Sequence, residues 1–233
     1  MRPAWTARLL RRLESRALLA LAAGAGAAWA FLAVADEMVE GGTLPLDRAI
    51  LLALRAPGTP ADPLGPHSLQ EAMRDVTALG GFTVLTLVTV LGAAMFLLHR
   101  KFHHALVLVA TVLVGQAGSS VLKNIYERPR PDLVPHAVYV YSASFPSGHS
   151  MLSATVYLTL AAVIASLEPG RAAKALVFAT AVLVMVAVGI SRIYLGVHWP
   201  SDVLAGWCAG AGLALVAWSV LLRLDSALPA QRR

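Results

Sequence analysis

The sequence has few charged residues and a single cysteine. Asp, Glu, Lys and Arg make up 14% of the 233 residues, whereas soluble domains carry about 25%. Hydrophobic residues make up 58%, above the roughly 45–50% of an ordinary soluble domain. The lone Cys208 excludes an intrachain disulfide and a cysteine-based zinc site, so cysteine usage says nothing about the compartment. This composition is typical of a membrane protein.

Six apolar segments approach the length of about 20 residues that a helix needs to cross a bilayer. They are residues 17–35, 81–98, 105–122, 150–167, 175–195 and 203–222. The net charge is +6, and the Lys and Arg residues lie beside these segments, which favours a membrane surface over a nucleic-acid partner. We therefore expect an all-α, six-transmembrane-helix bundle that forms a single domain over residues 1–233.

The first apolar segment has an alternative interpretation. A basic stretch precedes it, and Ala33-Val34-Ala35 resembles a signal-peptidase site. The segment is longer than the apolar part of a usual signal peptide, so a retained helix is favoured.

Residues 36–79 are expected to form a loop on the outer side of the membrane. Two stretches, PLDRAILLALR and LQEAMRDVTAL, have helical spacing of apolar residues and predict short helices at the membrane surface. Between them, APGTPADPLGPHS repeatedly interrupts regular structure.

The distribution of Lys and Arg predicts the orientation of the chain. With both termini in the cytoplasm, twelve of the 19 Lys and Arg residues lie on the inner side and seven on the outer side. The bias supports that orientation, and the alanine-rich composition favours a bacterial inner membrane. The HRKFHH stretch, with His99, His103 and His104, then lies inside, where an ordinary basic surface loop is favoured over a metal site.

Three polar clusters follow or precede apolar segments on the predicted outer side: LKNIYERPRPD, FPSGHS and SRIYLGVHWPSD. They contain three cations near membrane depth, where charge is costly and usually functional: Lys123, Arg130 and Arg192. Ser147 and Gly148 start a helix, and free backbone N–H groups at a helix start bind anions. Cations, amides and a hydroxyl together predict a phosphate site.

Two histidines complete these clusters. His198 and Asp202 are four residues apart, so they share a face if one helix contains both. A carboxylate beside an imidazole fixes its tautomer, which suits a nucleophilic histidine. His149 lies in the turn before the fourth apolar segment, where it could protonate a leaving oxygen.

These clusters resemble the three-part signature of the type 2 phosphatidic acid phosphatase (PAP2) family. The matching positions are Lys123 through NIYERP to Arg130-Pro131, then Pro146-Ser147-Gly148-His149, then Ser191-Arg192 through IYLGV to His198 and through WPS to Asp202. Every motif position agrees, and the region that carries the motifs spans about 81–222.

The resemblance implies a role for each position. It makes His198 the nucleophile that forms a phosphohistidine, Asp202 its orienting partner and His149 the general acid and base. The implied phosphate-binding residues are Lys123, Arg130, Ser147, Gly148 and Arg192. No metal or other cofactor and no obligate protein partner is implied. The expected partners are membrane lipids and a lipid phosphate substrate.

The residues leave the substrate open among undecaprenyl diphosphate, phosphatidic acid and phosphatidylglycerol phosphate, and undecaprenyl diphosphate is our first choice. A lipid A phosphatase, or a phosphotransferase with another acceptor, would use the same site. A non-catalytic carrier of anionic lipids is the alternative from a different class. Carriers typically bind near the bilayer midplane, whereas these charges lie at helix ends.

Overall fold

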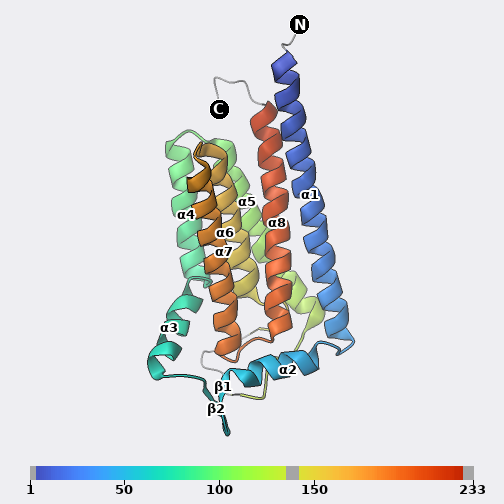
Figure 1. The fold of residues 1–233 in the computed structure, drawn as a ribbon, viewed down its shortest axis with the longest axis vertical. Helices are drawn as coiled ribbons and strands as arrows, with labels where there is room; N and C mark the ends of the chain where they lie inside the picture. Colours follow the sequence, from blue (N-terminus) through green and yellow to red (C-terminus); the bar gives the residue numbers. More distant parts are fainter. Residues whose placement is uncertain (1–3, 135–141, 228–233) are drawn as a thin grey trace.

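The computed structural model describes the backbone of residues 4–134 and 142–227 and the side chains from Ser15 onward. Six long or medium helices run roughly side by side as a bundle (Figure 1). They are α1 (Ala4–Val39), α4 (Phe82–Leu98), α5 (Phe102–Tyr126), α6 (Gly148–Leu167), α7 (Arg171–Tyr194) and α8 (Pro200–Ala227). The beginning of α1 and the end of α8 lie at the same end of the bundle.

A smaller cap covers the other end of the bundle (Figure 1). It comprises α2 (Leu44–Ala53), the strands β1 (Arg55–Ala56) and β2 (Thr59–Pro63), and α3 (His67–Ala78). The two short helices form over most of the stretches that the sequence indicates, but α2 begins one residue and α3 two residues earlier. The antiparallel hairpin between them was not predicted, and it turns at Gly58, whose φ of 80° suits glycine.

Five helices are long and apolar enough to cross a membrane: α1, α5, α6, α7 and α8. The helix α4 has 17 residues and qualifies as a sixth span only together with α3, from which it is bent by 46°. Apolar side chains such as Leu87, Leu113 and Leu183 are exposed on the bundle surface, as expected for lipid-facing positions. The all-helical membrane bundle is therefore confirmed, with five or six spans.

The helix α6 is the centre of the bundle and packs against α4, α5, α7 and α8. Small residues permit the closest of these approaches. A Cβ added to Gly206 or Gly210 of α8 would come within 2.8 Å of the Ser147 carbonyl oxygen or 2.3 Å of the Met151 carbonyl oxygen. The small-xxx-small pattern of Gly206 and Gly210 thus lets α8 pack closely against the start of α6.

The helix α5 extends beyond the predicted apolar segment 105–122 and continues to Tyr126, so Lys123 lies in its last turn. The helix α7 ends at Tyr194, one residue before the predicted end, so Arg192 lies in its last turn. Hydropathy marks only the apolar part of a helix, while backbone hydrogen bonding continues into the polar turns. These polar turns carry the candidate site.

Candidate active site

The three predicted clusters meet at the capped end of the bundle. They come from the last turns of α5 and α7, the first turns of α6 and α8, and the loops beside them. The Ser147 N–H donates to the Asp202 carbonyl oxygen at 3.0 Å, and an added Cβ on Gly148 would lie 3.6 Å from Lys123 Cε. His149 is within electrostatic range of Arg192 and His198. The fold therefore brings all eight predicted site residues together.

His198 is held with one ring nitrogen toward a carboxylate and the other toward a cation. Its Nδ1 is 3.3 Å from Asp202 Oδ2, and Arg130 Nη1 is 3.2 Å from its Nε2. An arginine only donates hydrogen bonds, so this arrangement places the proton on Nδ1 and the lone pair on Nε2. The reactive nitrogen then faces the cationic side of the site.

The proximity of His198 and Asp202 has a different origin from the one expected. The helix α8 begins at Pro200, so His198 precedes the helix and does not share its face with Asp202. Asp202 Oδ2 accepts a hydrogen bond from the Trp199 N–H at 2.9 Å, as an acidic residue in a first turn can do. The turn at the start of α8 therefore brings the imidazole to the carboxylate.

Asp202 is fixed by residues outside the predicted motif. Arg128 Nη1 donates to Asp202 Oδ1 at 2.6 Å, and the same guanidinium donates through Nη2 to Asp47 Oδ2 at 2.8 Å. Ser144 Oγ donates to Asp202 Oδ2. Asp47, on α2, also accepts from the Ser201 N–H at 2.8 Å. This buried network ties the cap to the start of α8 and determines the orientation of Asp202.

Arg128, Asp47, Ser144 and Ser201 are functional candidates that sequence reasoning did not assign. Arg128 lies two residues from Arg130 and had no assigned role, although an arginine so close to the motif was a signal. Asp47 and Ser201 are 154 positions apart, and neither belongs to a recognisable motif. Their pairing is a tertiary feature.

The three motif cations are not neutralised by carboxylates. Lys123 Nζ donates to the Ala143 carbonyl oxygen, Arg130 Nη1 to that of Val197 at 2.7 Å, and Arg192 Nη1 to Thr77 Oγ1 at 3.0 Å. Within the described residues none of the three makes a salt bridge, and the buried Nε of Arg192 has no hydrogen-bond partner. Three such cations near one histidine favour the binding of an anion with more than one negative charge.

Ser147 caps the helix whose first turn forms part of the site. Its Oγ accepts hydrogen bonds from the Ser150 N–H at 3.5 Å and from Ser150 Oγ at 3.0 Å, and its side chain is buried. The helix α6 begins at Gly148, and the amides of its first turn have no carbonyl partner within the helix. The cap thus fixes an N-terminal anion site, and His149 lies in the same turn.

Burial and charge both favour the neutral form of His198. Burial lowers its pKa well below the usual value, and the nearby cations Arg192, Arg130 and Lys123 lower it further. Burial also lowers the pKa of Arg130, which still stays charged at neutral pH. A neutral imidazole with an unprotonated Nε2 is the form that can act as a nucleophile.

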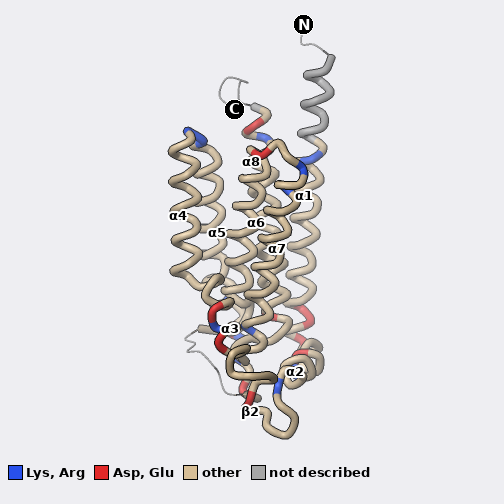
Figure 2. The backbone as a smooth tube through the Cα atoms, turned by 60° about the vertical axis from the view of Figure 1, so that its left-hand side comes forward, with Lys and Arg blue, Asp and Glu red and all other residues tan. Residues whose placement is uncertain are grey.

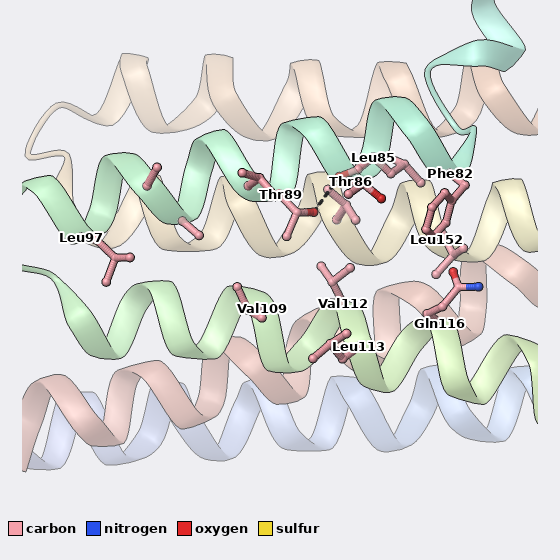
Figure 3. A pocket seen from close by; sticks show the side chains of 14 residues that line it. Phe82, Leu85, Thr86, Thr89, Leu97, Val109, Val112, Leu113, Gln116 and Leu152 are labelled. Carbon is pink, nitrogen blue, oxygen red and sulfur yellow. Dashed lines mark hydrogen bonds between the residues drawn. The ribbon is translucent and has the colours of Figure 1, made fainter.

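An apolar cavity of about 480 Å³ lies between α4, α5 and α6. Figure 3 shows side chains of α4, such as Thr89, facing those of α5, such as Val112, across it. Gln116 and Leu152 line the end nearest the site, because Gln116 is about two turns before Lys123 and Leu152 is three residues after His149. The cavity could hold a hydrocarbon chain beside the polar site.

A membrane-spanning helical bundle with a buried histidine among three cations is the arrangement expected of a membrane protein that acts on a phosphate group. The family model of the PAP2 superfamily matches residues 104–225. The chain therefore belongs to the PAP2 superfamily, and the expected family is confirmed.

Three similar proteins carry related names. Phosphatidylglycerophosphatase B of Bacillus subtilis (strain 168) is 40% identical over 144 residues, covering 61% of this chain and 70% of the relative. An undecaprenyl-diphosphatase of Sulfolobus acidocaldarius is 25% identical over 130 residues, covering 54% of this chain and 59% of the relative. The crystal structure of a transmembrane PAP2-type phosphatidylglycerolphosphate phosphatase from B. subtilis matches with a TM-score of 0.69 and 31% identity, covering 89% of this chain and 98% of that chain.

Proposed function

We propose that this chain is a single-domain, metal-independent membrane phosphatase that hydrolyses a lipid phosphate or diphosphate. The observation that carries the proposal is the set of three cations without carboxylate partners near His198, one of which, Arg130, contacts its Nε2. Cations stabilise the oxygens of a phosphoryl group directly, whereas a metal-dependent site would present carboxylates to the ion. The names of the relatives support the same reaction class.

The proposed reaction has two steps. The Nε2 lone pair of His198 attacks phosphorus, the bond from phosphorus to the leaving oxygen breaks, and protonated His149 gives its proton to that oxygen. Asp202 accepts the Nδ1 hydrogen bond and stabilises the charged ring. His149 then takes a proton from water, the water oxygen attacks phosphohistidine, and inorganic phosphate leaves with His198 restored.

The cations and amides bind the phosphoryl oxygens throughout this reaction. Lys123, Arg130 and Arg192 supply charge, and the capped first turn of α6 supplies N–H groups from Gly148 onward. In this proposal Ser147 fixes the first turn of α6 as its cap, and its hydroxyl, which only accepts hydrogen bonds from Ser150, keeps its own O–H to donate to a phosphoryl oxygen.

We also propose a topology with six spans, α4 being the span that α3 leads into, and with α2 and α3 lying at the membrane surface. The first span is retained in this proposal, since Phe31 and Ala35 of α1 pack in the cluster that contains Phe145, next to the site. Charge bias places the site on the extracytoplasmic face of a bacterial inner membrane, with both termini inside. A reporter fused after Thr59 should be outside and one fused after Gly170 inside, and the reverse result would refute this orientation.

The substrate is proposed to enter with its hydrocarbon chain in the apolar cavity between α4 and α5. Undecaprenyl diphosphate remains our first choice, with phosphatidylglycerol phosphate and phosphatidic acid as alternatives. The 40% identity to a phosphatidylglycerophosphatase favours phosphatidylglycerol phosphate more than the sequence alone did. Rates on the three lipids in matched detergent would rank them.

Release of inorganic phosphate by the purified protein in excess EDTA tests the proposed function. We expect full activity, because no step in the proposed reaction uses a metal. An activity that disappears and returns with Mg²⁺ would contradict metal independence. Binding of lipid phosphate without any release would identify a carrier, and transfer to an added alcohol in preference to water would identify a phosphotransferase.

A further inference from the structure

A second cationic cavity lies at the end of the bundle opposite the candidate active site. Long tan stretches of helix separate the two ends in Figure 2, and coloured charged segments gather at both. The cavity has a volume of about 790 Å³, within the usual range for ligand sites. Four cations line it, from α1, the turn before α5, and the first turn of α7: Arg16, Lys101, Arg171 and Lys174.

The positive charge of this cavity is not balanced. The side chains of its four cations make no hydrogen bond or ion pair with any residue that the structure describes. Asp225 is the one acidic residue in the described lining, and its Oδ1 is already 2.8 Å from His103 Nε2. A negatively charged ligand would therefore be attracted to this cavity.

The inner wall of the same cavity is apolar and aromatic. Phe178 and Trp218 line it with their ring centroids 6.2 Å apart, and Leu222 lies beside them. Phe178 also begins a shallow apolar groove of about 500 Å³ that continues along α7 past Val182 to Val186. The cavity, with cations near the end of the bundle, thus continues into an apolar groove that runs along α7.

We propose that this cavity and groove bind an intact anionic phospholipid, with its phosphate among the four cations and one acyl chain along α7. A free phosphate would use the cations but not the groove, whereas a phospholipid matches both. Charge bias places this end on the cytoplasmic side, where anionic headgroups are available to basic residues between helices. The site is separate from the proposed reaction and does not depend on it.

A metal ion is the alternative occupant of this region. Ligand atoms of His103, His104 and Asp225 all lie within 4.8 Å of one another, and the buried Nδ1 of His104 lacks a hydrogen-bond partner among the described residues. The four nearby cations oppose a divalent ion at this position, which favours the anion. The sequence indicated a basic loop here, and the structure adds Asp225 to it.

The test is thermal unfolding of the full-length protein in a neutral detergent with added phosphatidylglycerol. A phosphodiester lipid is used because it carries no terminal phosphate for hydrolysis. At about 100 times its Kd the lipid should raise Tm by about 5–10 °C, since it binds only the folded state. The double variant Arg171→Gln/Lys174→Gln should bind roughly 30-fold more weakly, because each cation near an anionic lipid contributes about a factor of five.

The control variant is Arg223→Gln, which removes an exposed arginine from the same end of α8 without changing the described cavity lining. It should behave as the wild type. Ala179→Trp, which fills the groove on α7, should weaken phosphatidylglycerol binding and leave the basal Tm within a few degrees. All three variants should retain phosphate release, and this separates the cavity from the active site.

Several results would overturn the proposal. One is an equal Tm shift in the wild type and the double variant, and another is an equal shift with phosphatidylcholine. Inorganic phosphate that reproduces the shift and its dependence on Arg171 and Lys174 would show a free-anion site instead. Stabilisation by Zn²⁺ that His103→Ala removes, without any effect of phospholipid, would show a metal site.

Discussion

At one end of the bundle His198 Nδ1 lies 3.3 Å from Asp202 Oδ2, and at the other end His103 Nε2 lies 2.8 Å from Asp225 Oδ1. The first pair is 2% and 0% exposed, and the second is 20% and 28% exposed. Asp202 is also held by Arg128, Ser144 and the Trp199 N–H. Among the described residues, the contacts of the Asp225 carboxylate are with His103 and His104.

The shorter contact therefore belongs to the pair that we do not assign to catalysis. A short His–Asp distance at a partly exposed site is weakly stabilising and does little to fix the orientation of either side chain. At the candidate active site, several donors hold the carboxylate, which in turn holds the imidazole with Nε2 toward Arg130, and Lys123 and Arg192 lie within electrostatic range of the ring. The surroundings of the pair, more than its distance, determine whether it can act on phosphate.

Replacing the histidines of the two pairs should produce the largest contrast. His198→Ala should lower kcat/KM by at least about 10⁴-fold on every lipid substrate, because it removes the atom that accepts the phosphoryl group. His103→Ala should leave the rate within about twofold. Steady-state phosphate release and trapping of phosphohistidine under alkaline quench measure both. A phosphoenzyme that survives in His198→Ala would refute the assignment.

The loss of rate caused by His149→Ala should depend on the leaving group of the substrate. A lipid monophosphate expels an alkoxide, which needs a proton, and general acids contribute about 10²- to 10⁴-fold in such cases. A lipid diphosphate expels a lipid phosphate whose second pKa is near 6, so it leaves without help. His149→Ala should thus slow phosphoenzyme formation from phosphatidic acid far more than from undecaprenyl diphosphate. Equal single-turnover losses on both substrates would contradict a general-acid role.

Removing Arg128, which holds Asp202, should make the His198–Asp202 pair behave more like the His103–Asp225 pair. Arg128→Met leaves the carboxylates of Asp47 and Asp202 buried without their cation, at a cost of about 3–5 kcal/mol in unfolding free energy. We expect activity to fall about 10- to 100-fold, as when residues that orient an active-site ligand are lost. Arg128→Met/Asp47→Asn should recover part of the stability, because one unpaired charge is gone.

The control for this experiment is Asp225→Asn, which removes the carboxylate of the partly exposed His103–Asp225 pair. Its effect on unfolding free energy should stay below about 1 kcal/mol. Urea unfolding monitored by tryptophan fluorescence, together with phosphate release, provides both readouts. A loss of stability in Asp225→Asn as large as that in Arg128→Met would show that the two pairs are equally embedded.

The smallest predicted effect concerns pH. Burial and three cations lower the pKa of His198, so the ring should stay neutral as the pH falls below 6.5, and it should take up a proton only at lower pH. An unperturbed histidine with a pKa near 6.5 would be about nine-tenths protonated at pH 5.5. Histidine ¹⁵N resonances of the phosphate-free protein, assigned with His198→Gln, measure this directly. A midpoint at or above 6.5 would contradict the proposed charge balance.

Much of this site could be predicted from the sequence, because its residues lie in three short stretches of the chain. The PAP2 motif places Lys123 and Arg130 around one helix end, Ser147 to His149 at one helix start, and Arg192 to Asp202 around one turn. The apolar segments that separate them are long, and their hydropathy is a property of each segment alone. The family model confirms the resemblance, although the role of each residue remains a prediction.

Other features depended on contacts between distant segments. The sequence places His198 and Asp202 on one face only if one helix contains both, and the structure does not meet this condition. The helix α8 begins at Pro200, and the turn that the Trp199 N–H completes brings the two residues together. No hydrophobic pattern in the sequence predicted the hairpin at Gly58. The number of membrane spans is five or six, because α4 alone is too short to qualify and counts as a span only together with α3, from which it is bent.

The sequence by itself determined the membrane class, the helical segments and the three motif clusters, because hydropathy and motif spacing depend only on residues that are close together in the chain. Only the tertiary structure decided that Arg128 joins Asp47 of the cap to Asp202, and that His103 meets Asp225 at the far end. Asp47 is 81 residues from Arg128, and Asp225 is 122 residues from His103. No local periodicity links positions so far apart, and their pairing depends on how the helices pack.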